Sequence, residues 1–459
     1  MRLPSPYALE FNGMSKYFYL ETFGCQMNVV DSERIVGLLN QIDYHPVDNA
    51  EQADLVLLNT CSVRDKAERK VYGHLGRFKP IKDRRPELII GVGGCVAEQE
   101  GDKMLAEVPY LDLVFGTHNV HRLPELVQQA ESGQRRQSIT GFLDRETRLN
   151  LFPQRSQSDS ITRFVTVMQG CDNFCSYCIV PHVRGREISR PSDEILKEVT
   201  ALVAQGVREI TLLGQNVNSY GNKDGAELSF AELVKSVARI EGLERLRFTT
   251  SHPRDISDEL IDCFATVDKL CHHLHLPVQS GSNRILHLMN RGYTREEYLG
   301  CVAKLKQICP DIRLTTDIIV GFPGENETDF DQTLDLVAKV DYADAFTFLY
   351  SKRTGTAAAE LEDETSARVK QQRFDRLLKL QQENSKRIWE SDLGLSLPIL
   401  VEGSSRQGEG QLFGRSGWNR IVNFNGPTSL IGQVVPVRIV KILRNSHVGE
   451  LSYPPEGEK

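Results

Sequence analysis

Short apolar runs alternate with helix-like segments along the first 110 residues of the chain. Three of these runs have the length of buried strands, and they span residues 17–20, 55–58 and 88–92. Alternating strands and helices predict a parallel sheet covered by helices, in which ligands bind at the carboxyl ends of the strands. A cysteine follows each run, and the three are Cys25, Cys61 and Cys95. The pattern therefore predicts three thiols on one rim of the sheet.

The same alternation resumes after residue 160. Six strand-like runs follow, at 164–168, 209–213, 245–249, 272–276, 313–319 and 345–349. Helical spacing of apolar residues appears between them, for example at 191–205 and 294–309. Six such units predict an open, partial (β/α)6 barrel, in which residues at the carboxyl ends of the strands carry out the chemistry.

The pattern changes after a charged, helix-like segment at 365–390. Four short strand-like runs follow, at 397–401, 410–414, 421–424 and 434–442, and glycine and proline separate them. This pattern predicts a small antiparallel barrel. The fold class is therefore α/β with an all-β C-terminal barrel. The expected domains are 15–131, 157–390 and 391–455, and the polar, weakly patterned segment 132–156 is interpreted as a linker.

Composition narrows the class of protein. The length of 459 residues suggests two or three domains, and no apolar run approaches the roughly 18 residues of a membrane span. We therefore expect a cytoplasmic protein without a membrane partner. The net charge of −7 argues against indiscriminate coating of nucleic acid. Basic residues nevertheless gather at 64–85 and 404–447, which indicates an RNA-facing side.

Cysteine usage points to metal chemistry. The cytoplasm keeps thiols reduced, so ten cysteines favour metal binding or burial over disulfides. Three of them form a CxxxCxxC loop after the first strand of the central domain, and these are Cys171, Cys175 and Cys178. Iron–sulfur clusters normally take four thiolates, so three imply an iron with an open position. A zinc knuckle is the alternative, since spacing does not name the metal.

The three dispersed N-terminal cysteines allow two interpretations. A single free cysteine is more often a small buried hydrophobic residue than a ligand. Three of them in register favour a second cluster with three thiolate ligands. The remaining cysteines lie at no metal-ligand spacing and are expected in the core; they are Cys263, Cys271, Cys301 and Cys309. The histidines near 272 are interpreted as structural residues or substrate contacts.

The CxxxCxxC loop, with Tyr177 before its last cysteine, resembles the signature of the radical S-adenosylmethionine (radical SAM) enzymes. The dispersed cysteines ahead of it narrow the resemblance to the methylthiotransferase family, which has a flavodoxin-like N-terminal domain. The stretch 414–424 is similar to the RNA-binding TRAM domain, and 60–67 most resembles the branch acting on tRNA. The resemblance implies two [4Fe–4S] clusters, one on each set of three cysteines, with S-adenosylmethionine on the open iron of the loop cluster.

The family comparison also assigns other site residues. It suggests that four residues line the pocket for S-adenosylmethionine or the nucleoside: Gln215, Asn216, Gln279 and Asp317. Arg184 is expected at the same pocket, where its guanidinium can pair with a carboxylate or phosphate. In the C-terminal barrel the predicted RNA contacts are Arg415, Asn419, Arg420, Arg438, Lys441 and Arg444. Trp418 is expected either to stack on a base or to anchor the core.

The activity implied by the resemblance is methylthiolation of C2 of N6-isopentenyladenosine at position 37 of tRNA. The hydrogen at C2 is not acidic, so a 5′-deoxyadenosyl radical must remove it, and the N-terminal cluster supplies the sulfur. The implied partners are the tRNA anticodon loop, a low-potential electron donor such as flavodoxin or ferredoxin, and a sulfur donor. The alternatives are threonylcarbamoyladenosine-37 or a ribosomal-protein aspartate as substrate, or a non-enzymatic, metal-containing RNA-binding protein.

Overall fold

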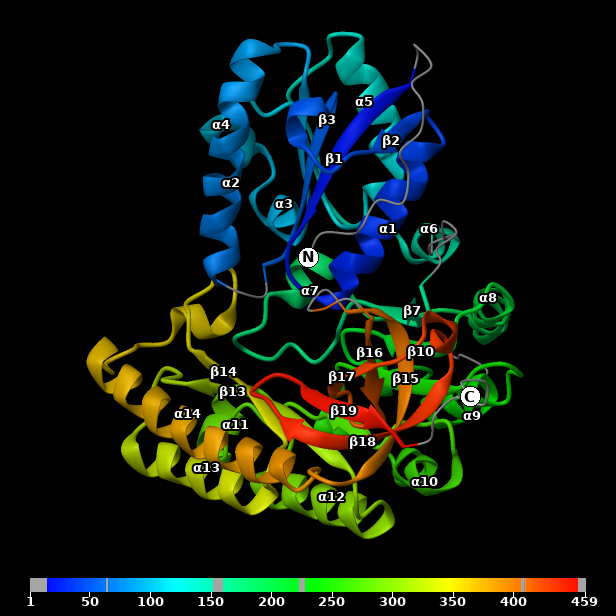
Figure 1. Ribbon diagram of the computed structural model, residues 1–459. Helices are drawn as coiled ribbons and strands as arrows, with labels where there is room; N and C mark the ends of the chain where they lie inside the picture. The colour runs from blue at the N-terminus through cyan, green and yellow to red at the C-terminus, as the bar shows by residue number, and fades with distance from the viewer. Residues whose placement is uncertain are drawn as a thin grey trace.

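The computed structural model describes residues 15–62, 65–151, 160–222, 228–405, 408 and 410–452. Three regions follow one another along the chain (Figure 1). An N-terminal α/β region, blue to cyan, lies above a central α/β region, green to yellow, and an orange-to-red barrel packs against the central strands. Within the described part of the chain, no helix has the length and apolar character needed to span a membrane. Val63 and Arg64, in the stretch that most resembles the tRNA branch, lie outside the described residues.

Six parallel strands form the N-terminal sheet. In sheet order they are β2 (Tyr44–Pro46), β1 (Lys16–Thr22), β3 (Leu55–Thr60), β4 (Ile89–Gly94), β5 (Leu113–Phe115) and β6 (Gln137–Ile139). Helices α1 (Gln26–Asn40) and α5 (Leu123–Glu131) cover one face, and α2 (Asp65–Arg84), α3 (Cys95–Glu100) and α4 (Asp102–Glu107) cover the other. The first five strands have the flavodoxin-like order, as predicted.

Strand β3 shows why both faces are covered. Leu55 and Leu57 pack beneath α1 and α5, whereas Val56 and Leu58 pack beneath α2, α3 and α4. Successive side chains of a strand point to opposite faces, so a continuous apolar run belongs to a strand buried on both sides. The expected strand at 55–58 is therefore confirmed.

The segment 132–156 differs from the linker that we expected. Strand β6 lies within it and pairs in parallel with β5, and helix α6 (Arg145–Asn150) follows. The first part of this segment therefore belongs to the N-terminal sheet, although its three strand residues carry little apolar signal. Residues 152–156 lie outside the described residues.

The central strands form two parallel sheets of three. In sheet order they are β11 (Arg245–Thr249), β10 (Glu209–Leu213) and β7 (Thr162–Thr166), then β12 (His273–His275), β13 (Arg313–Val320) and β14 (Asp344–Leu349). A bridge between Leu246 and Leu270 links the two sheets into one open arrangement. All six strands fall on the predicted runs, so the partial barrel is confirmed. A short antiparallel pair, β8 (Met168–Gln169) and β9 (Ile188–Ser189), flanks the first strand.

Helices cover the outer side of these strands. They are α8 (Ser192–Ala204), α9 (Phe230–Ala238), α10 (Asp258–Thr266), α11 (Asn283–Leu288), α12 (Arg295–Ile308), α13 (Glu327–Val340) and α14 (Ala367–Glu390). Ile210 and Leu246 of the strands belong to the core beneath these helices. Their neighbours Glu209, Arg245 and Arg247 therefore point to the opposite, inner side.

The C-terminal region is a closed barrel. Its strands, in barrel order, are β15 (Ser396–Ser404), β16 (Gln411–Ser416), β17 (Ile421–Asn425), β19 (His447–Leu451) and β18 (Val434–Ile442). Neighbours are antiparallel except β17 and β19, which are parallel. We did not predict β19, because a glycine and a glutamate interrupt its apolar pattern.

This barrel docks on the inner side of the central strands. Arg245 and Arg247 of β11 donate hydrogen bonds to the backbone carbonyls of residues 398, 415, 416 and 417 in the barrel. Arg247 also lies 3.0 Å from the buried carboxylate of Glu209. Buried charges and their partners thus join the two regions.

Replacing Arg247 with alanine should destabilise the docked barrel. The substitution leaves Glu209 buried without its cation, which typically costs about 3–5 kcal/mol. The midpoint of urea denaturation should fall accordingly. The control is Arg438→Ala, because Arg438 forms an exposed pair with Glu450 at 2.8 Å and should contribute at most about 1 kcal/mol. Equal shifts in the two variants would refute the docking role.

Candidate functional site

Three cysteines come together at the carboxyl ends of the N-terminal strands, as the sequence predicted. Cys25 caps the N-terminus of α1, Cys61 follows β3, and Cys95 begins α3 after β4. A hydrogen bond with Cys61 lowers the pKa of Cys25 to about 6, because it stabilises the thiolate against the opposing effect of burial. Burial raises the pKa of Cys95, and the positive charge of Arg184 opposes that rise. We call these three residues the N-terminal trio.

Two glycines allow the segments that carry the N-terminal trio to approach one another closely. Gly24 has a φ of +107°, and a Cβ there would lie 2.1 Å from Cβ of Cys61. Gly94 has a φ of +95°, and its Cβ would lie 2.3 Å from the backbone oxygen of Thr60. A side chain at either position would push apart the segments that carry the thiols.

Arg184 lies at the N-terminal trio and is buried there. Its guanidinium is 2.6 Å from the carboxylate of Asp31 and donates to the side-chain oxygen of Asn28 at 3.2 Å. Burial lowers the pKa of Arg184, but Asp31 and the thiols of Cys95 and Cys25 more than offset this and raise it, so the side chain stays charged. The carboxylate that pairs with Arg184 belongs to the protein, so a contact between Arg184 and S-adenosylmethionine stays a prediction.

The CxxxCxxC loop follows β8 and holds Cys171, Cys175 and Cys178, which we call the loop trio. The backbone N–H of Cys178 donates to the carbonyl of Cys175 at 2.9 Å, and Phe174 between the first two cysteines has a φ of +47°. Burial, together with the neighbouring thiols, raises the pKa of Cys171 to about 12 and that of Cys178 to about 11. Negative charge on this trio therefore requires compensation by a cation.

Arg291 is a buried cation at the loop trio, and sequence reasoning missed it. It donates to Sγ of Cys175 at 3.2 Å, to the hydroxyl of Tyr177 at 3.3 Å and to the carbonyl of Pro277 at 2.9 Å. Hydrogen bonds to ligating sulfurs tune iron–sulfur clusters. No local motif marks Arg291, since 116 residues separate it from Cys175.

The two trios face the same region between the domains. Cys95 packs against Ile179 and Val183, which immediately follow the loop trio. Cys25 packs near Leu213, the last residue of β10. Helix α7 (Val180–Arg184) lies between the N-terminal sheet and the central strands in Figure 1, and its last residue is Arg184. A short helix thus connects the loop trio to the N-terminal trio.

The residues predicted to line the pocket lie in two places. Gln215 accepts a hydrogen bond from the backbone N–H of Gly170 at 2.6 Å, directly before Cys171. The side chain of Asn216 donates to Asp255 at 2.6 Å, and its own oxygen has no hydrogen-bond partner among the described residues.

Gln279 and Asp317 lie together on the neighbouring sheet. The N–H of Gln279 donates to the carbonyl of Asp317 at 2.9 Å, and Gln279 has a φ of +70°. The Asp317 carboxylate lies 3.6 Å from Nε2 of His275. A left-handed conformation at a residue other than glycine marks a position that the surrounding structure must hold in place.

The thiol sets fit iron–sulfur clusters. All six cysteines are free, each set has three, and a buried arginine compensates charge at each set. Three thiolates leave one iron of a four-iron cluster open to another ligand. The donor sets therefore suit two clusters with open positions, close to one interdomain region.

Two predicted RNA contacts, Arg420 and Trp418, instead pack against neighbouring parts of the protein. Arg420 is buried, donates to the carbonyls of Leu443 and Arg444 at 2.8 Å each, and stacks on Trp389. The Arg313 guanidinium lies 4.7 Å from the ring centroid of Trp418. These residues hold the barrel against its neighbours.

The other predicted RNA contacts of the C-terminal barrel lie nearer the surface. Arg415 lies 3.0 Å from the Glu402 carboxylate, so its charge is paired within the barrel. The remaining side chains are exposed, and they are Asn419, Arg438, Lys441 and Arg444.

Comparisons with known proteins match most of the chain. Three family models match, namely Uncharacterized protein family UPF0004 at residues 17–116, the Radical SAM superfamily at 165–337 and the TRAM domain at 391–451. The tRNA-2-methylthio-N(6)-dimethylallyladenosine synthase of Syntrophotalea carbinolica is 62% identical over 435 residues, which cover 95% of this chain and 99% of that protein. The protein of the same name from Geotalea uraniireducens is 58% identical, with coverage of 95% and 99%.

A solved structure shares the fold. It is the radical S-adenosylmethionine methyltransferase TsrM from Kitasatospora setae, with a TM-score of 0.58 and 15% sequence identity. The match covers 86% of this chain and 82% of that one. At this identity the likeness concerns the fold alone.

Proposed function

Because the chain belongs to the family of the tRNA-2-methylthio-N(6)-dimethylallyladenosine synthases, we propose that it adds a methylthio group to C2 of N6-isopentenyladenosine at position 37 of tRNA. The observation that carries this proposal is the pair of three-thiol sets at one interdomain region. Hydrogen removal and sulfur transfer at one carbon require both centres within reach of that carbon.

In this proposal the loop trio holds the [4Fe–4S] cluster that binds S-adenosylmethionine, and the N-terminal trio holds a second [4Fe–4S] cluster. When bound, these groups supply the radical chemistry that breaks the non-acidic C2–H bond and the sulfur that replaces the hydrogen. The residues of the chain orient the groups. Gln215 fixes Gly170 at the start of the loop, and Arg291 holds Cys175.

The same proposal assigns the other site residues. Gln279 and Asp317 are placed to contact S-adenosylmethionine or the nucleoside, since they lie near the carboxyl ends of the central strands. Arg184 stabilises negative charge at the N-terminal trio. Two cysteines of each trio are buried, namely Cys61 and Cys95 in the N-terminal trio and Cys171 and Cys175 in the loop trio, which limits the access of water.

The exposed cations of the C-terminal barrel are proposed to bind tRNA phosphates. Lys441 and Arg444 lie on the surface near the end of β18, whereas the inward-facing Arg420 and Trp418 hold the barrel in place. Phosphate contacts provide affinity without sequence choice. Selection of the target base is therefore assigned to the interdomain region.

Reversing charge at Lys441 and Arg444 together, each to glutamate, should weaken tRNA binding several-fold. Each lost phosphate contact should also reduce the slope of log affinity against log salt by about 1. Fluorescence anisotropy over a series of KCl concentrations measures both effects. The control is Lys386→Glu on α14, where Lys386 is exposed and paired with Glu390 at 3.7 Å. An equal loss in the control variant would indicate an effect of net charge alone.

The activity is tested by anaerobic reaction of the enzyme with tRNA that carries N6-isopentenyladenosine, followed by mass spectrometry of the nucleosides. We expect 2-methylthio-N6-isopentenyladenosine. Product only from threonylcarbamoyladenosine, or only on a ribosomal protein, would overturn the proposal. The electron donor, the sulfur donor and the cytoplasmic location stay predictions.

A further inference from the structure

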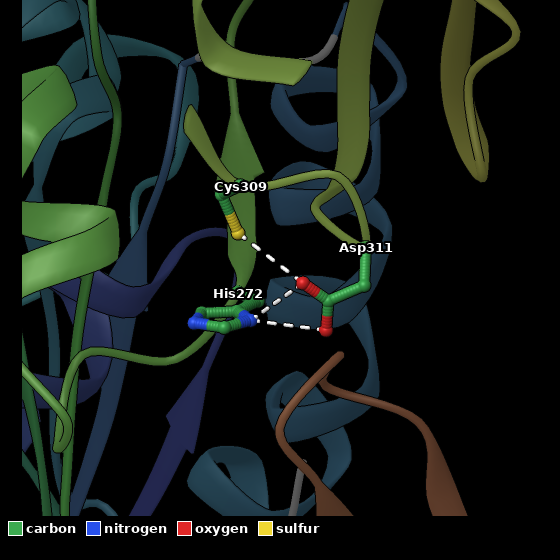
Figure 2. A group of neighbouring side chains, drawn as sticks. All are labelled: His272, Cys309 and Asp311. Atoms are coloured by element: carbon green, nitrogen blue, oxygen red, sulfur yellow. Dashed lines mark hydrogen bonds and ion pairs between the residues drawn. The ribbon is translucent and has the colours of Figure 1, made fainter. Parts of the chain in front are cut away.

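Three side chains with different ligand atoms converge far from both trios (Figure 2). They are His272, Cys309 and Asp311, and their ligand atoms all lie within 4.8 Å of one another. Nδ1 of His272 is 2.8 and 3.0 Å from the two carboxylate oxygens of Asp311. Sγ of Cys309 donates to the nearer of these oxygens at 3.4 Å. A nitrogen, a sulfur and an oxygen therefore surround one small space.

The backbone holds these three residues in place. Cys309 is the C-cap of α12, and its N–H donates to the carbonyl of Leu305 at 2.8 Å. Ile312 donates to the carbonyl of Cys309 at 3.1 Å, which closes the turn that carries Asp311. Arg313 donates to the carbonyl of His272 at 2.9 Å and ties that turn to the neighbouring strand. The ligand atoms thus sit on a defined scaffold.

The cluster lies at the opposite end of the central strands from the candidate active site. His272 precedes β12 and Asp311 precedes β13, whereas Gln279 follows β12. Strand β13 is eight residues long, about 26 Å at roughly 3.3 Å per residue. The three side chains therefore belong to a separate site.

We propose that His272, Cys309 and Asp311 bind a divalent cation of borderline softness, with zinc as the best match. Zinc takes thiolate, imidazole and carboxylate ligands at about 2.0–2.3 Å in tetrahedral geometry, which places ligand atoms about 3.3–3.6 Å apart. The separation of 3.4 Å between Sγ of Cys309 and the Asp311 carboxylate already lies in that range. The separations of 2.8 and 3.0 Å between His272 and Asp311 are slightly shorter, and the partly exposed His272 ring must move outward by a few tenths of an ångström to admit the ion. A water molecule completes the four ligands.

Charge and exposure favour this assignment. The thiol proton of Cys309 and the ring proton of His272 both point at the Asp311 carboxylate, so a cation would replace two protons in the same space. A thiolate and a carboxylate neutralise its two positive charges. The His272 and Asp311 side chains are 39% and 52% exposed, so an ion can enter from solvent. Such an ion would link the turn between α12 and β13, which carries Cys309 and Asp311, to His272 directly before β12.

The test uses the iron-loaded enzyme, dialysed anaerobically against Zn²⁺ and then against metal-free buffer. X-ray absorption at the zinc edge is blind to iron, so the clusters do not interfere. We expect one zinc per chain, with one sulfur neighbour at about 2.3 Å and nitrogen or oxygen neighbours at about 2.0–2.1 Å. Cys309→Ser and His272→Gln should each bind zinc at least about tenfold more weakly, because even the loss of a partner that only orients a ligand costs about 10–100-fold in metal affinity.

The matched control is Cys301→Ser, which removes another non-cluster thiol from the same helix, and it should retain zinc as the unaltered chain does. His272→Gln changes an exposed residue, so it separates loss of the ion from any folding defect of Cys309→Ser. Zinc with three sulfur neighbours would place the ion in a trio and overturn the proposal. Failure of the unaltered chain to retain zinc, or equal retention by all variants, would also overturn it.

Discussion

Replacing Cys175 with alanine is expected to abolish reductive cleavage of S-adenosylmethionine, so that formation of 5′-deoxyadenosine falls to background. The substitution removes one of three thiolates from the loop trio and leaves the buried guanidinium of Arg291 without its sulfur acceptor. Two thiolates do not secure a four-iron cluster. The measurement is quantification of 5′-deoxyadenosine by mass spectrometry after anaerobic incubation with dithionite.

Cys263→Ala is the control for this experiment. Cys263 is a buried core cysteine on α10, and its replacement should leave cleavage measurable. Iron content separates the two variants further. The Cys175 variant should retain about four of roughly eight iron atoms, and the control should retain all of them. Undiminished 5′-deoxyadenosine from the Cys175 variant would refute the assignment of the loop trio.

Replacing Cys61 with alanine should separate the two halves of the reaction. Cleavage of S-adenosylmethionine should remain measurable, because the loop trio lies on the central region and keeps Arg291. Transfer of the methylthio group should stop, because Cys61 is buried within the N-terminal trio and its hydrogen bond stabilises the Cys25 thiolate. Nucleosides from the reacted tRNA should therefore contain only unmodified N6-isopentenyladenosine.

The comparison variant is Cys301→Ala, which lacks a cysteine outside both trios and should give normal product. Loss of both cleavage and transfer in the Cys61 variant would show that the trios do not act separately. Normal methylthiolated product from that variant would remove the N-terminal trio from the reaction. Each result is read from the same pair of mass-spectrometric measurements.

Much of the fold was predictable because its strands are apolar runs of typical length. The expected strands at 209–213 and 245–249 have the bounds found for β10 and β11. Strand β6 was missed, because three residues at the edge of a sheet, of which only Ile139 is apolar, carry no periodic signal. Short edge strands gain their pairing from a neighbour that the local sequence does not specify.

The cysteines of both trios were predictable. Those of the loop trio are closely spaced in the sequence, and those of the N-terminal trio each follow a predicted strand. The contacts of the arginines with the two trios were not predictable from the sequence. Arg184 contacts Asn28 across 156 residues, and Arg291 contacts Cys175 across 116. The inward position of Arg420 was also hidden, because it depends on the docking of the barrel beside Trp389. A basic residue on a short strand has the same local pattern whether it faces RNA or a neighbouring domain.

The docking of the C-terminal barrel has a consequence for how such a chain can evolve. Arg245 and Arg247 are the donors, and every acceptor they use on the barrel is a main-chain oxygen. Substitutions at these barrel positions leave the main-chain oxygens in place, so a changed side chain does not by itself remove a docking hydrogen bond. Ser416 is constrained for another reason, because its buried hydroxyl accepts a hydrogen bond from the N–H of Arg420 at 3.3 Å. Substitutions of the exposed charged side chains of the barrel can then change which RNA molecules it binds, while its docking on the central strands is preserved.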